Sequence, residues 1–257
     1  MTNGYGGMKR RKRLKPRYFF IGAFLVFTLF FCSIYLIYTG LFIPNKLFLP
    51  RDAIIGCDVS HYQGEIQWEV LSTQKISFAF IKATEGSSHI DAKFEENWNL
   101  ASETNLYLGA YHFFSFESPG STQAEHFCEQ VGKRESMMLP VVDIEFYGSF
   151  HEKNTDPIEI RKQLDAFIQV IEKNYGTKPI IYTTKEGYRH FIKGYYLDCP
   201  LWIRSILTYP SLDRTWTFWQ YTSREQLKGY EGEETYIDMN VFHGDEEDFK
   251  ELFIQIP

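Results

Sequence analysis

Acidic residues are absent from the first 43 positions of the chain, and basic residues are the minority in the rest. Seven of the 27 Lys and Arg residues lie between Lys9 and Arg17, whereas all 33 acidic residues follow position 43. Residues 44–257 therefore carry a net charge of −13. Contact with phosphates needs clustered Lys and Arg, so this acidic remainder excludes nucleic acid as a partner.

Cysteine is scarce as well, with four in 257 residues. Cys32 falls within an apolar run, which leaves Cys57, Cys128 and Cys199 in the rest of the chain. Three cysteines do not make a disulfide framework, although one pair could form in an oxidising compartment, and their spacings fit no zinc site. A domain of about 200 residues buries enough surface on folding to be stable without disulfides. We expect neither a metal nor a cofactor.

The signatures of several enzyme classes are missing too. The sequence has no G-x-S-x-G nucleophile elbow and no phosphate-binding P-loop. Neither His61 nor His112 stands in a base–nucleophile pattern with a Ser or Cys, so we expect His112 to be a hydrogen-bonded residue of the fold. No internal repeat or low-complexity segment occurs.

Charge is absent from Tyr18 to Ile43, a run of 26 residues. As a helix this run is about 39 Å long, enough to cross a hydrocarbon core of about 30 Å. The basic cluster before it predicts a cytoplasmic N-terminus and an extracytoplasmic remainder. A cleaved signal peptide is the alternative. Its apolar region would be shorter and would end in small residues, whereas apolar side chains here continue to Phe42.

The chain is therefore predicted to have four parts. Residues 1–17 form a basic cytoplasmic tail, 18–43 a single-pass signal anchor in the cell membrane, 44–53 a linker and 54–257 a folded domain. In the last part, eight short apolar segments are predicted strands, at 54–60, 78–84, 107–114, 138–146, 178–184, 200–206, 217–223 and 235–242.

Apolar residues at helical spacing occur between several of these strands, over 93–105, 119–133 and 158–175. Asp156 and Pro157 form a start signal for the last of these helices. Alternating strands and helices predict an α/β fold, a closed TIM-like (β/α) barrel of parallel strands. The last strands have short connectors, which predicts an irregular final third.

Carboxylates fall near the ends of several predicted strands. Asp58 ends the first strand, Asp143 and Glu145 end the fourth, and Asp238 lies late in the last. A barrel gathers the C-terminal ends of its strands on one face, where active sites of this fold are built. Like charges held close together raise at least one pKa, which leaves a proton available for acid catalysis.

Asp143-Ile144-Glu145 is the most informative of these patterns. Residues i and i+2 of a strand point to the same side, so both carboxylates face the same way. Glycoside hydrolysis needs one carboxyl group to protonate the leaving oxygen and a second group to assist at the sugar. The alternatives are a solvated triplet for this pair, a helix cap for Asp58 and a turn residue for Asp238.

Aromatic residues also gather at the predicted strand ends. Sugars stack their apolar faces on aromatic rings, and concave sites combine such rings with a few polar groups. Aromatic residues in strands are more often part of the core, so only some of this set are expected to contact a substrate. The set is Tyr111, Phe113, Tyr182, Trp202, Trp219 and Tyr221.

These residues lie in motifs that resemble the family 25 glycoside hydrolases, the lysozyme-like muramidases. The resemblance covers roughly residues 54–245 in order. The matching motifs are GCDVSHYQG at 56–64, FIKATEG at 80–86, GAYHF at 109–113, LPVVDIE at 139–145, WQYT at 219–222 and IDMNVF at 237–242.

The resemblance implies a flattened, incomplete β/α barrel and hydrolysis of the β-1,4 bond between N-acetylmuramic acid and N-acetylglucosamine of peptidoglycan, without a metal. It implies that Glu145 is the acid/base, and that Asp143 positions the substrate's own acetamido group. Asp58 and Asp238 would complete an acidic floor. The expected substrate contacts are Tyr111, Tyr182, Trp202, Gln220, Lys82 and Phe113.

One segment departs from the family pattern. After Leu201-Trp202, many members have Ala and then an aromatic residue, whereas this chain continues with Ile203-Arg204. The family pattern therefore does not assign the residues that contact the outer sugars. Two other functions also remain open: a wall-binding module without catalysis, and a glycosidase acting on another N-acetylated polymer such as chitin.

Overall fold

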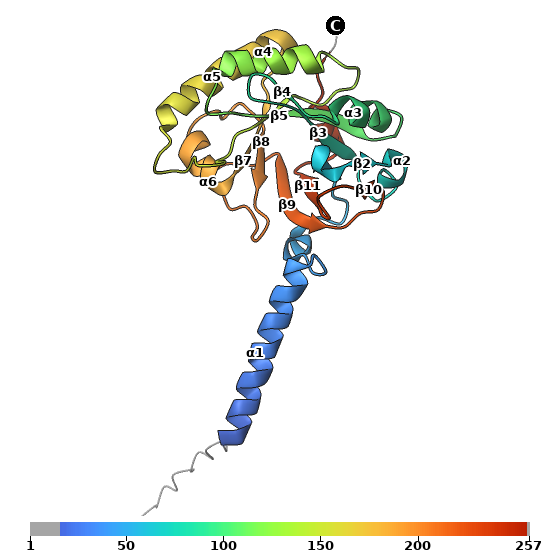
Figure 1. The fold of residues 1–257 in the computed structure, drawn as a ribbon, viewed down its shortest axis with the longest axis vertical. Coiled ribbons are helices and arrows are strands. Elements are labelled where there is room, and N and C mark those ends of the chain that lie inside the picture. Colours follow the sequence, from blue (N-terminus) through green and yellow to red (C-terminus); the bar gives the residue numbers. More distant parts are fainter. Residues whose placement is uncertain (1–15, 256–257) are drawn as a thin grey trace, which may run out of the picture. The chain divides into compact units, whose positions relative to one another are not determined.

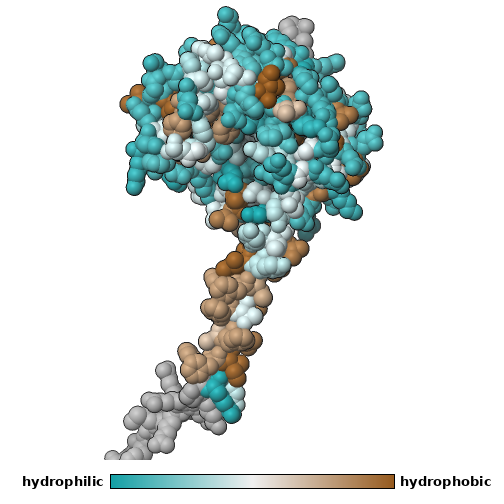
Figure 2. All heavy atoms as spheres, in the orientation of Figure 1, coloured by the Kyte–Doolittle hydropathy of each residue, from teal (hydrophilic) through white to brown (hydrophobic). Residues whose placement is uncertain are grey.

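The computed structural model describes residues 16–255, and the chain divides into two units, Met1–Phe42 and Ile43–Pro257. The first unit contains α1 (Pro16–Tyr38), a single helix of 23 residues. Apolar side chains cover its visible face (Figure 2), and its large hydrophobic residues are exposed. The helix is long and apolar enough to be a candidate membrane span. A signal sequence near the N-terminus can meet the same criterion of length and composition. Most of the predicted basic tail, including the cluster from Lys9 to Lys15, lies outside the described residues.

The second unit is built on a closed barrel of eight strands (Figure 1). Its sheet has the order β1-β11-β9-β8-β7-β6-β5-β3-β4, and pairing of β1 with β3 closes it. All eight predicted strands are present, as β1 (Ile55–Val59), β3 (Phe78–Glu85), β5 (Tyr107–Phe113), β6 (Val141–Asp143), β7 (Ile180–Thr184), β8 (Leu201–Arg204), β9 (Phe218–Glu225) and β11 (Ile237–Phe242). The predicted fold class is confirmed.

The prediction that all strands run parallel is wrong for β11, which is antiparallel to both β1 and β9. The reason lies in the connection from β9 to β11, which contains only β10 (Tyr230–Glu231) and no helix. Parallel neighbours need a long crossover, whereas a short connection joins antiparallel strands. The final third is therefore irregular, as the short connectors predicted.

Three short strands were not predicted. The two-residue strand β4 (His89–Ile90) pairs with the end of β3. The pair formed by β2 (Glu65–Ile66) and β10 makes a separate antiparallel sheet. Strands of two residues are too short to give an alternating pattern in the sequence.

Helices cover the outside of the barrel between its early strands. The three predicted helices are confirmed as α3 (Phe94–Ser102), α4 (Gly120–Val131) and α5 (Pro157–Tyr175). Asp156 caps α5 by accepting a hydrogen bond from the backbone N–H of Ile158. The elements that were not predicted are short: η2 (His61–Gln63), α2 (Trp68–Leu71), α6 (Lys185–Gly187), the π-helical turn η3 (Tyr188–Ile192) and α7 (Glu246–Lys250).

Helices α4 and α5 pack side by side (Figure 1), and a glycine permits their close approach. A Cβ atom at Gly120 would lie 1.8 Å from the backbone oxygen of Gln163 in α5. The backbone N–H of Gly120 donates to the side-chain oxygen of Gln163 at 3.0 Å. Side chains on one face of α5, among them Leu164 and Phe167, are buried against the barrel.

Large aromatic side chains fill part of the domain core. Phe80 of β3 stacks on Trp202 of β8, with ring centroids 4.6 Å apart, and contacts Phe218 of β9 edge-on. These three side chains are buried, with at most 2% of their surface exposed. Trp202 also lines the cavity described below, so this packing supports one of its walls.

The first half of the predicted linker at 44–53 is bound to the barrel. Residues Pro44–Phe48 form the 3₁₀ helix η1. Asn45 is fully buried, and its amide donates hydrogen bonds to the backbone oxygens of Ser205 and Tyr221 at 2.9 and 2.8 Å. Lys46 forms an ion pair with Glu225 of β9. These contacts make η1 part of the second unit.

Candidate active site

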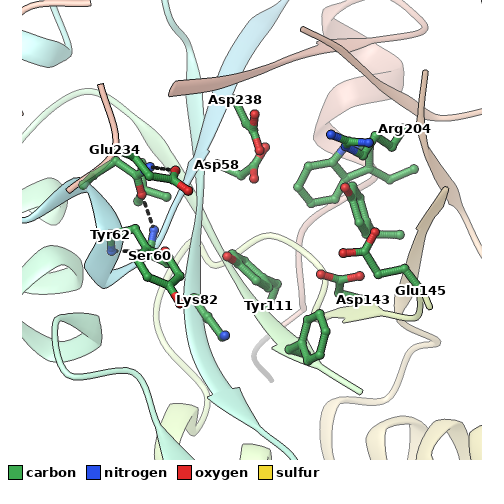
Figure 3. Close-up of a pocket in the computed structure, with 15 residues that line it drawn as sticks. Asp58, Ser60, Tyr62, Lys82, Tyr111, Asp143, Glu145, Arg204, Glu234 and Asp238 are labelled. Atoms are coloured by element: carbon green, nitrogen blue, oxygen red, sulfur yellow. Dashed lines mark hydrogen bonds between the residues drawn. The ribbon is translucent and has the colours of Figure 1, made fainter. Parts of the chain in front are cut away.

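A cavity of about 390 Å³ opens where most barrel strands end (Figure 3). The four carboxylates expected to be catalytic all line it: Asp58 from β1, Asp143 from the end of β6, Glu145 just beyond it and Asp238 from β11. Five of the six predicted substrate contacts line it as well: Lys82, Tyr111, Phe113, Tyr182 and Trp202. Gln220 is not among the lining residues.

Asp238 reaches this face for a different reason from the one the sequence suggested. It is the second residue of β11 and lies opposite Asp58 in the antiparallel register. An antiparallel strand presents its beginning on the face where parallel strands end. The expectation that Asp238 lies late in its strand is therefore wrong, while the expected gathering of the carboxylates is observed.

Gln220 of β9 lies beneath the cavity and joins Asp58 to Asp238. Its side-chain amide donates to one carboxylate oxygen of each, at 2.9 and 3.2 Å. Its own oxygen accepts a hydrogen bond from the Tyr182 hydroxyl at 3.1 Å. Asn240 donates a further hydrogen bond to Asp58 at 2.8 Å. Gln220 is fully buried, so its amide orients the acidic floor from below.

Burial raises the pKa of Asp58, and the hydrogen bonds from Asn240 and Gln220 oppose this rise. Burial also raises the pKa of Asp238 well above its usual range, and the nearby charge of Asp58 adds to the effect. Two facing carboxyl groups with raised pKa values favour sharing a proton over carrying two full charges.

Asp143 and Glu145 both point into the cavity, although β6 is shorter than the predicted strand at 138–146. The chain stays extended after Asp143 because the backbone N–H of Ile144 donates to the Tyr182 oxygen at 2.9 Å. The Thr183 hydroxyl donates to the Ile144 oxygen at 2.7 Å. Ile144 is fully buried, so the residues on either side of it can both face the opening (Figure 3).

The environment of this pair favours a retained proton. Burial raises the pKa of Asp143 well above its usual range, as does the charge of Glu145, while Lys82 acts in the opposite direction. Burial raises the pKa of Glu145 as well, and the cation of Arg204 opposes that rise. Within the described part of the chain, Oδ1 of Asp143 is buried and has no hydrogen-bond partner. The site therefore combines two carboxyl groups of raised pKa with a buried oxygen that can accept a hydrogen bond from a ligand.

Comparison with known proteins identifies the family to which this arrangement belongs. Residues 57–230 match the glycosyl hydrolases family 25. The chain belongs to this family. It is a glycoside hydrolase with the barrel fold that the sequence resemblance predicted.

A curated relative and two solved structures support the assignment. The chain is 33% identical over 209 residues to lysozyme M1 of Streptomyces globisporus, a match covering 76% of this chain and 70% of the relative. A family 25 glycosyl hydrolase from Bacillus anthracis superposes with a TM-score of 0.73 and 50% identity, over 77% of this chain and 92% of that one. The bacterial lysozyme from Streptomyces coelicolor has a TM-score of 0.70 and 30% identity, over 79% and 98%.

The aromatic residues of this family 25 enzyme divide into lining and supporting groups. Tyr111 and Tyr182 line the cavity, and burial together with the nearby carboxylates raises the pKa of each phenol, so both remain hydroxyl donors. Trp202 has only 2% of its surface exposed and donates its indole N–H to Asn240 at 2.9 Å. Trp219 and Tyr221 are buried and lie outside the cavity lining.

Lys82 has its charge already partnered. Its ammonium group donates to Glu85 at 2.7 Å and lies 5.1 Å from the centroid of the Phe113 ring. These contacts hold the cation at the wall of the cavity, where it favours negative charge on Asp143.

Six lining residues of the enzyme were not predicted as site residues: Val59, Ser60, Tyr62, Gln63, Arg204 and Glu234. Four of them lie outside the barrel strands, where no periodic pattern marks them, although Ser60 to Gln63 fall inside the quoted opening motif. Gln63 donates to Glu234 at 2.8 Å, which links two loops at the rim. Arg204 could have been identified from the sequence, because it belongs to the segment that departs from the family pattern.

His112 is a structural residue of the enzyme, as predicted. It is fully buried, with one ring nitrogen 2.8 Å from the Thr84 hydroxyl and the other 3.1 Å from the Gln123 side-chain oxygen. Burial lowers its pKa to about 3, so the ring is neutral. Cys57, Cys128 and Cys199 are free thiols. No cluster of His, Cys, Asp or Glu within residues 16–255 could hold a metal ion.

Proposed function

We propose that this enzyme is a muramidase that hydrolyses the β-1,4 bond between N-acetylmuramic acid and N-acetylglucosamine in peptidoglycan. The observation that carries this proposal is the position of Asp143 and Glu145, side by side in the open cavity of a family 25 barrel. Relatives named lysozyme or N,O-diacetylmuramidase support the choice of substrate.

Glu145 is the proposed acid/base. Its raised pKa keeps a proton available for the glycosidic oxygen of the leaving sugar. When Glu145 holds that proton, it no longer repels charge on its neighbour, and Lys82 favours a carboxylate at Asp143. The pair can therefore divide its roles, with the proton on Glu145 and the negative charge on Asp143.

Asp143 is proposed to hold the substrate's 2-acetamido group. Its unpartnered Oδ1 can accept the amide N–H, which orients the acetamido oxygen toward the anomeric carbon. That oxygen attacks C1 as the bond to the leaving oxygen breaks and the proton of Glu145 transfers to the leaving group. Glu145 then removes a proton from water, which attacks C1, opens the cyclic intermediate and leaves a product of retained configuration.

Asp58 and Asp238 are proposed to complete the acidic floor. The hydrogen bonds from Gln220 fix their orientation, and their charge favours the positive character that develops on the sugar ring. Tyr111, Tyr182, Trp202, Phe113 and Lys82 are proposed to contact the sugars. Gln220 is proposed to act through the carboxylates that it holds.

We also propose that α1 anchors the enzyme in the cell membrane as a single pass, with the N-terminus in the cytoplasm and the barrel outside. The length and apolar surface of α1 support the span, and the basic residues between Lys9 and Arg17 support the orientation. The substrate of a peptidoglycan hydrolase lies on that same side of the membrane.

Product analysis tests the proposed activity. Purified full-length enzyme in detergent is incubated with peptidoglycan and, in parallel, with chitin. The proposal predicts soluble fragments from peptidoglycan whose new reducing end is N-acetylmuramic acid, identified by borohydride reduction and mass spectrometry. Reducing ends made of N-acetylglucosamine, or faster release from chitin, would contradict it. Binding without any release would indicate a wall-binding module.

A further inference from the structure

Arg204 lies where two cavities meet. It is the last residue of β8, in register with Thr184 of β7 and Gln220 of β9. It lines the cavity that contains Asp143 and Glu145, and also a neighbouring cavity of about 370 Å³. In Figure 3, its guanidinium lies on the same side of the opening as Glu145. A ligand that extends from the acidic cavity into the neighbouring one would pass this side chain.

The guanidinium of Arg204 makes no hydrogen bond or ion pair with any residue between 16 and 255. Lys82, the other cation of the acidic cavity, is by contrast paired with Glu85. Arg204 is half-buried at the end of its strand, so part of its hydration is already removed. A guanidinium presents a planar fork of five N–H donors that fits a carboxylate with two parallel hydrogen bonds.

The charges of the neighbouring cavity differ from those of the acidic cavity. Arg204 and Arg224 line it together with two carboxylates, Glu234 and Asp238. Glu234 is exposed and already accepts a hydrogen bond from Gln63. Burial, together with the charge of Asp58, raises the pKa of Asp238 well above its usual range. The neighbouring cavity thus has as many guanidinium groups as carboxyl groups, whereas carboxyl groups outnumber cations in the first cavity.

Further side chains suit the neighbouring cavity to a polar ligand. The guanidinium of Arg224 lies 4.9 Å from the centroid of the Tyr236 ring, which holds it against the cavity wall. Ser223 and Thr235 supply hydroxyl groups to the same lining. Beside its two carboxyl groups, this lining therefore offers guanidinium and hydroxyl donors that suit an anion with several oxygen atoms.

We infer that Arg204 and Arg224 form a subsite for a carboxylate carried on the 3-O-lactyl arm of the muramoyl sugar. This inference rests on the proposed function, because the lactyl arm is what distinguishes N-acetylmuramic acid from N-acetylglucosamine. On peptide-free strands the lactyl carboxyl group itself is ionised. On peptide-bearing strands the lactyl group is amide-bonded, and the stem peptide supplies carboxylates instead. Both sources present the same chemistry to the guanidinium fork of Arg204.

The test compares substrates that differ only in that charge. Peptide-free muramoyl strands are prepared with the lactyl group as a free carboxylate, and again with it converted to a primary amide. The native full-length enzyme should cleave the carboxylate form with a kcat/KM about tenfold higher, the size expected for one charge-assisted hydrogen bond. Peptide-bearing strands form a third arm and show whether stem carboxylates can replace the lactyl carboxylate.

Two variants and a control assign the preference to Arg204. Arg204→Gln should reduce the carboxylate-to-amide ratio to about one, mainly through a higher KM for the carboxylate form, and Arg204→Lys should restore part of the ratio. Arg189→Gln removes the same charge from an exposed position outside both cavities and should keep the native ratio.

Two outcomes would overturn the inference, and a third, distinguishable from them, would overturn the proposed function on which it rests. Equal cleavage of both forms by the native enzyme would show that no carboxylate is recognised. A native ratio that persists in Arg204→Gln, with both forms slowed alike, would show that Arg204 acts only through the carboxylates of the acidic cavity. Failure of the native enzyme to cleave any muramoyl strand would instead overturn the proposed function.

Discussion

Asp58 lies directly opposite Asp238 in the antiparallel register of β1 and β11, and one amide group donates a hydrogen bond to both. That amide belongs to Gln220, which is fully buried and accepts a hydrogen bond from Tyr182 in turn. Facing carboxylates repel each other unless a proton or a shared donor lies between them. Gln220 is therefore the residue that sets the geometry of the acidic floor.

Substitution of Gln220 by Met should weaken both turnover and stability. The variant keeps the volume of the side chain but leaves the hydrogen-bonding groups of Asp58, Asp238 and Tyr182 with fewer partners. Unsatisfied buried polar groups cost about 1–3 kcal/mol, and we expect turnover to fall at least about tenfold. Dye release from peptidoglycan and thermal unfolding measure the two effects. Gln226→Met, at an exposed position, should change neither. Native turnover in Gln220→Met would contradict this role.

Stability should decrease as the pH rises from acid toward neutral. Burial raises the pKa values of Asp58, Asp143, Glu145 and Asp238 in the folded enzyme. The folded state therefore holds more protons than the unfolded chain above about pH 4, and the free energy of unfolding falls as pH increases through the folded pKa values. Carboxylates with lowered pKa values, such as Asp198, are exposed, so solvent screens their opposite effect.

Thermal unfolding of the full-length enzyme in detergent, followed by circular dichroism from about pH 4 to about pH 7, measures this trend. The midpoint should fall across the range. Asp143→Asn removes one of the titrating groups, so the slope should be shallower in this variant. A midpoint that rises with pH, or an unchanged slope in Asp143→Asn, would contradict the account.

The strands and the positions of Asp143 and Glu145 could be predicted because their signals are local. Apolar segments marked all eight barrel strands, and the alternation of side chains placed Asp143 and Glu145 on one side. The direction of β11 could not be predicted in this way, since it depends on how the chain returns from β9. Asp238 was correctly predicted to lie near the other carboxylates. The predicted reason, a position late in a parallel strand, was wrong.

The supporting residues were harder to predict than the lining ones. Gln220 was expected to contact substrate, and only the three-dimensional register of β9 and β11 shows that it lies beneath Asp58 and Asp238. Asn45 lies in the segment predicted as a linker. Its binding to the barrel was not predicted, because its two backbone partners are 160 and 176 positions away in the chain. Contacts of that range leave no periodic pattern in the sequence.

Participation of the substrate's acetamido group predicts a particular stereochemical outcome. The oxygen of that group attacks C1 from one face and water attacks from the other, so the product keeps the β configuration. Proton NMR of the fresh reducing end measures it before the anomers equilibrate. Intact-mass spectrometry of the quenched enzyme should show no sugar attached to Asp143. An α product would indicate a water activated across the ring, and a glycosyl ester would make Asp143 a direct nucleophile.

Membrane topology is tested with protease added to intact spheroplasts that express the full chain. The basic cluster between Lys9 and Arg17 and the apolar run of α1 predict that the barrel is digested and that only a small N-terminal fragment survives. Substitution of the seven basic residues in this cluster by Gln should weaken the orientation. A barrel protected until lysis would contradict the orientation. A mature chain that lacks residues 1–43 would show that the segment is a cleaved signal.

Glu145 is proposed to supply the proton that releases the leaving sugar, and the rest of the mechanism depends on this role. The most direct measurement is the turnover of dye-labelled peptidoglycan by native enzyme and by Glu145→Gln, with Glu117→Gln as a control at an exposed site outside the cavity. Glu145→Gln should keep the fold and substrate binding but lose at least about 10²-fold in turnover, since general acid catalysis contributes about 10²–10⁴-fold. Retention of more than about a tenth of native turnover would contradict this role.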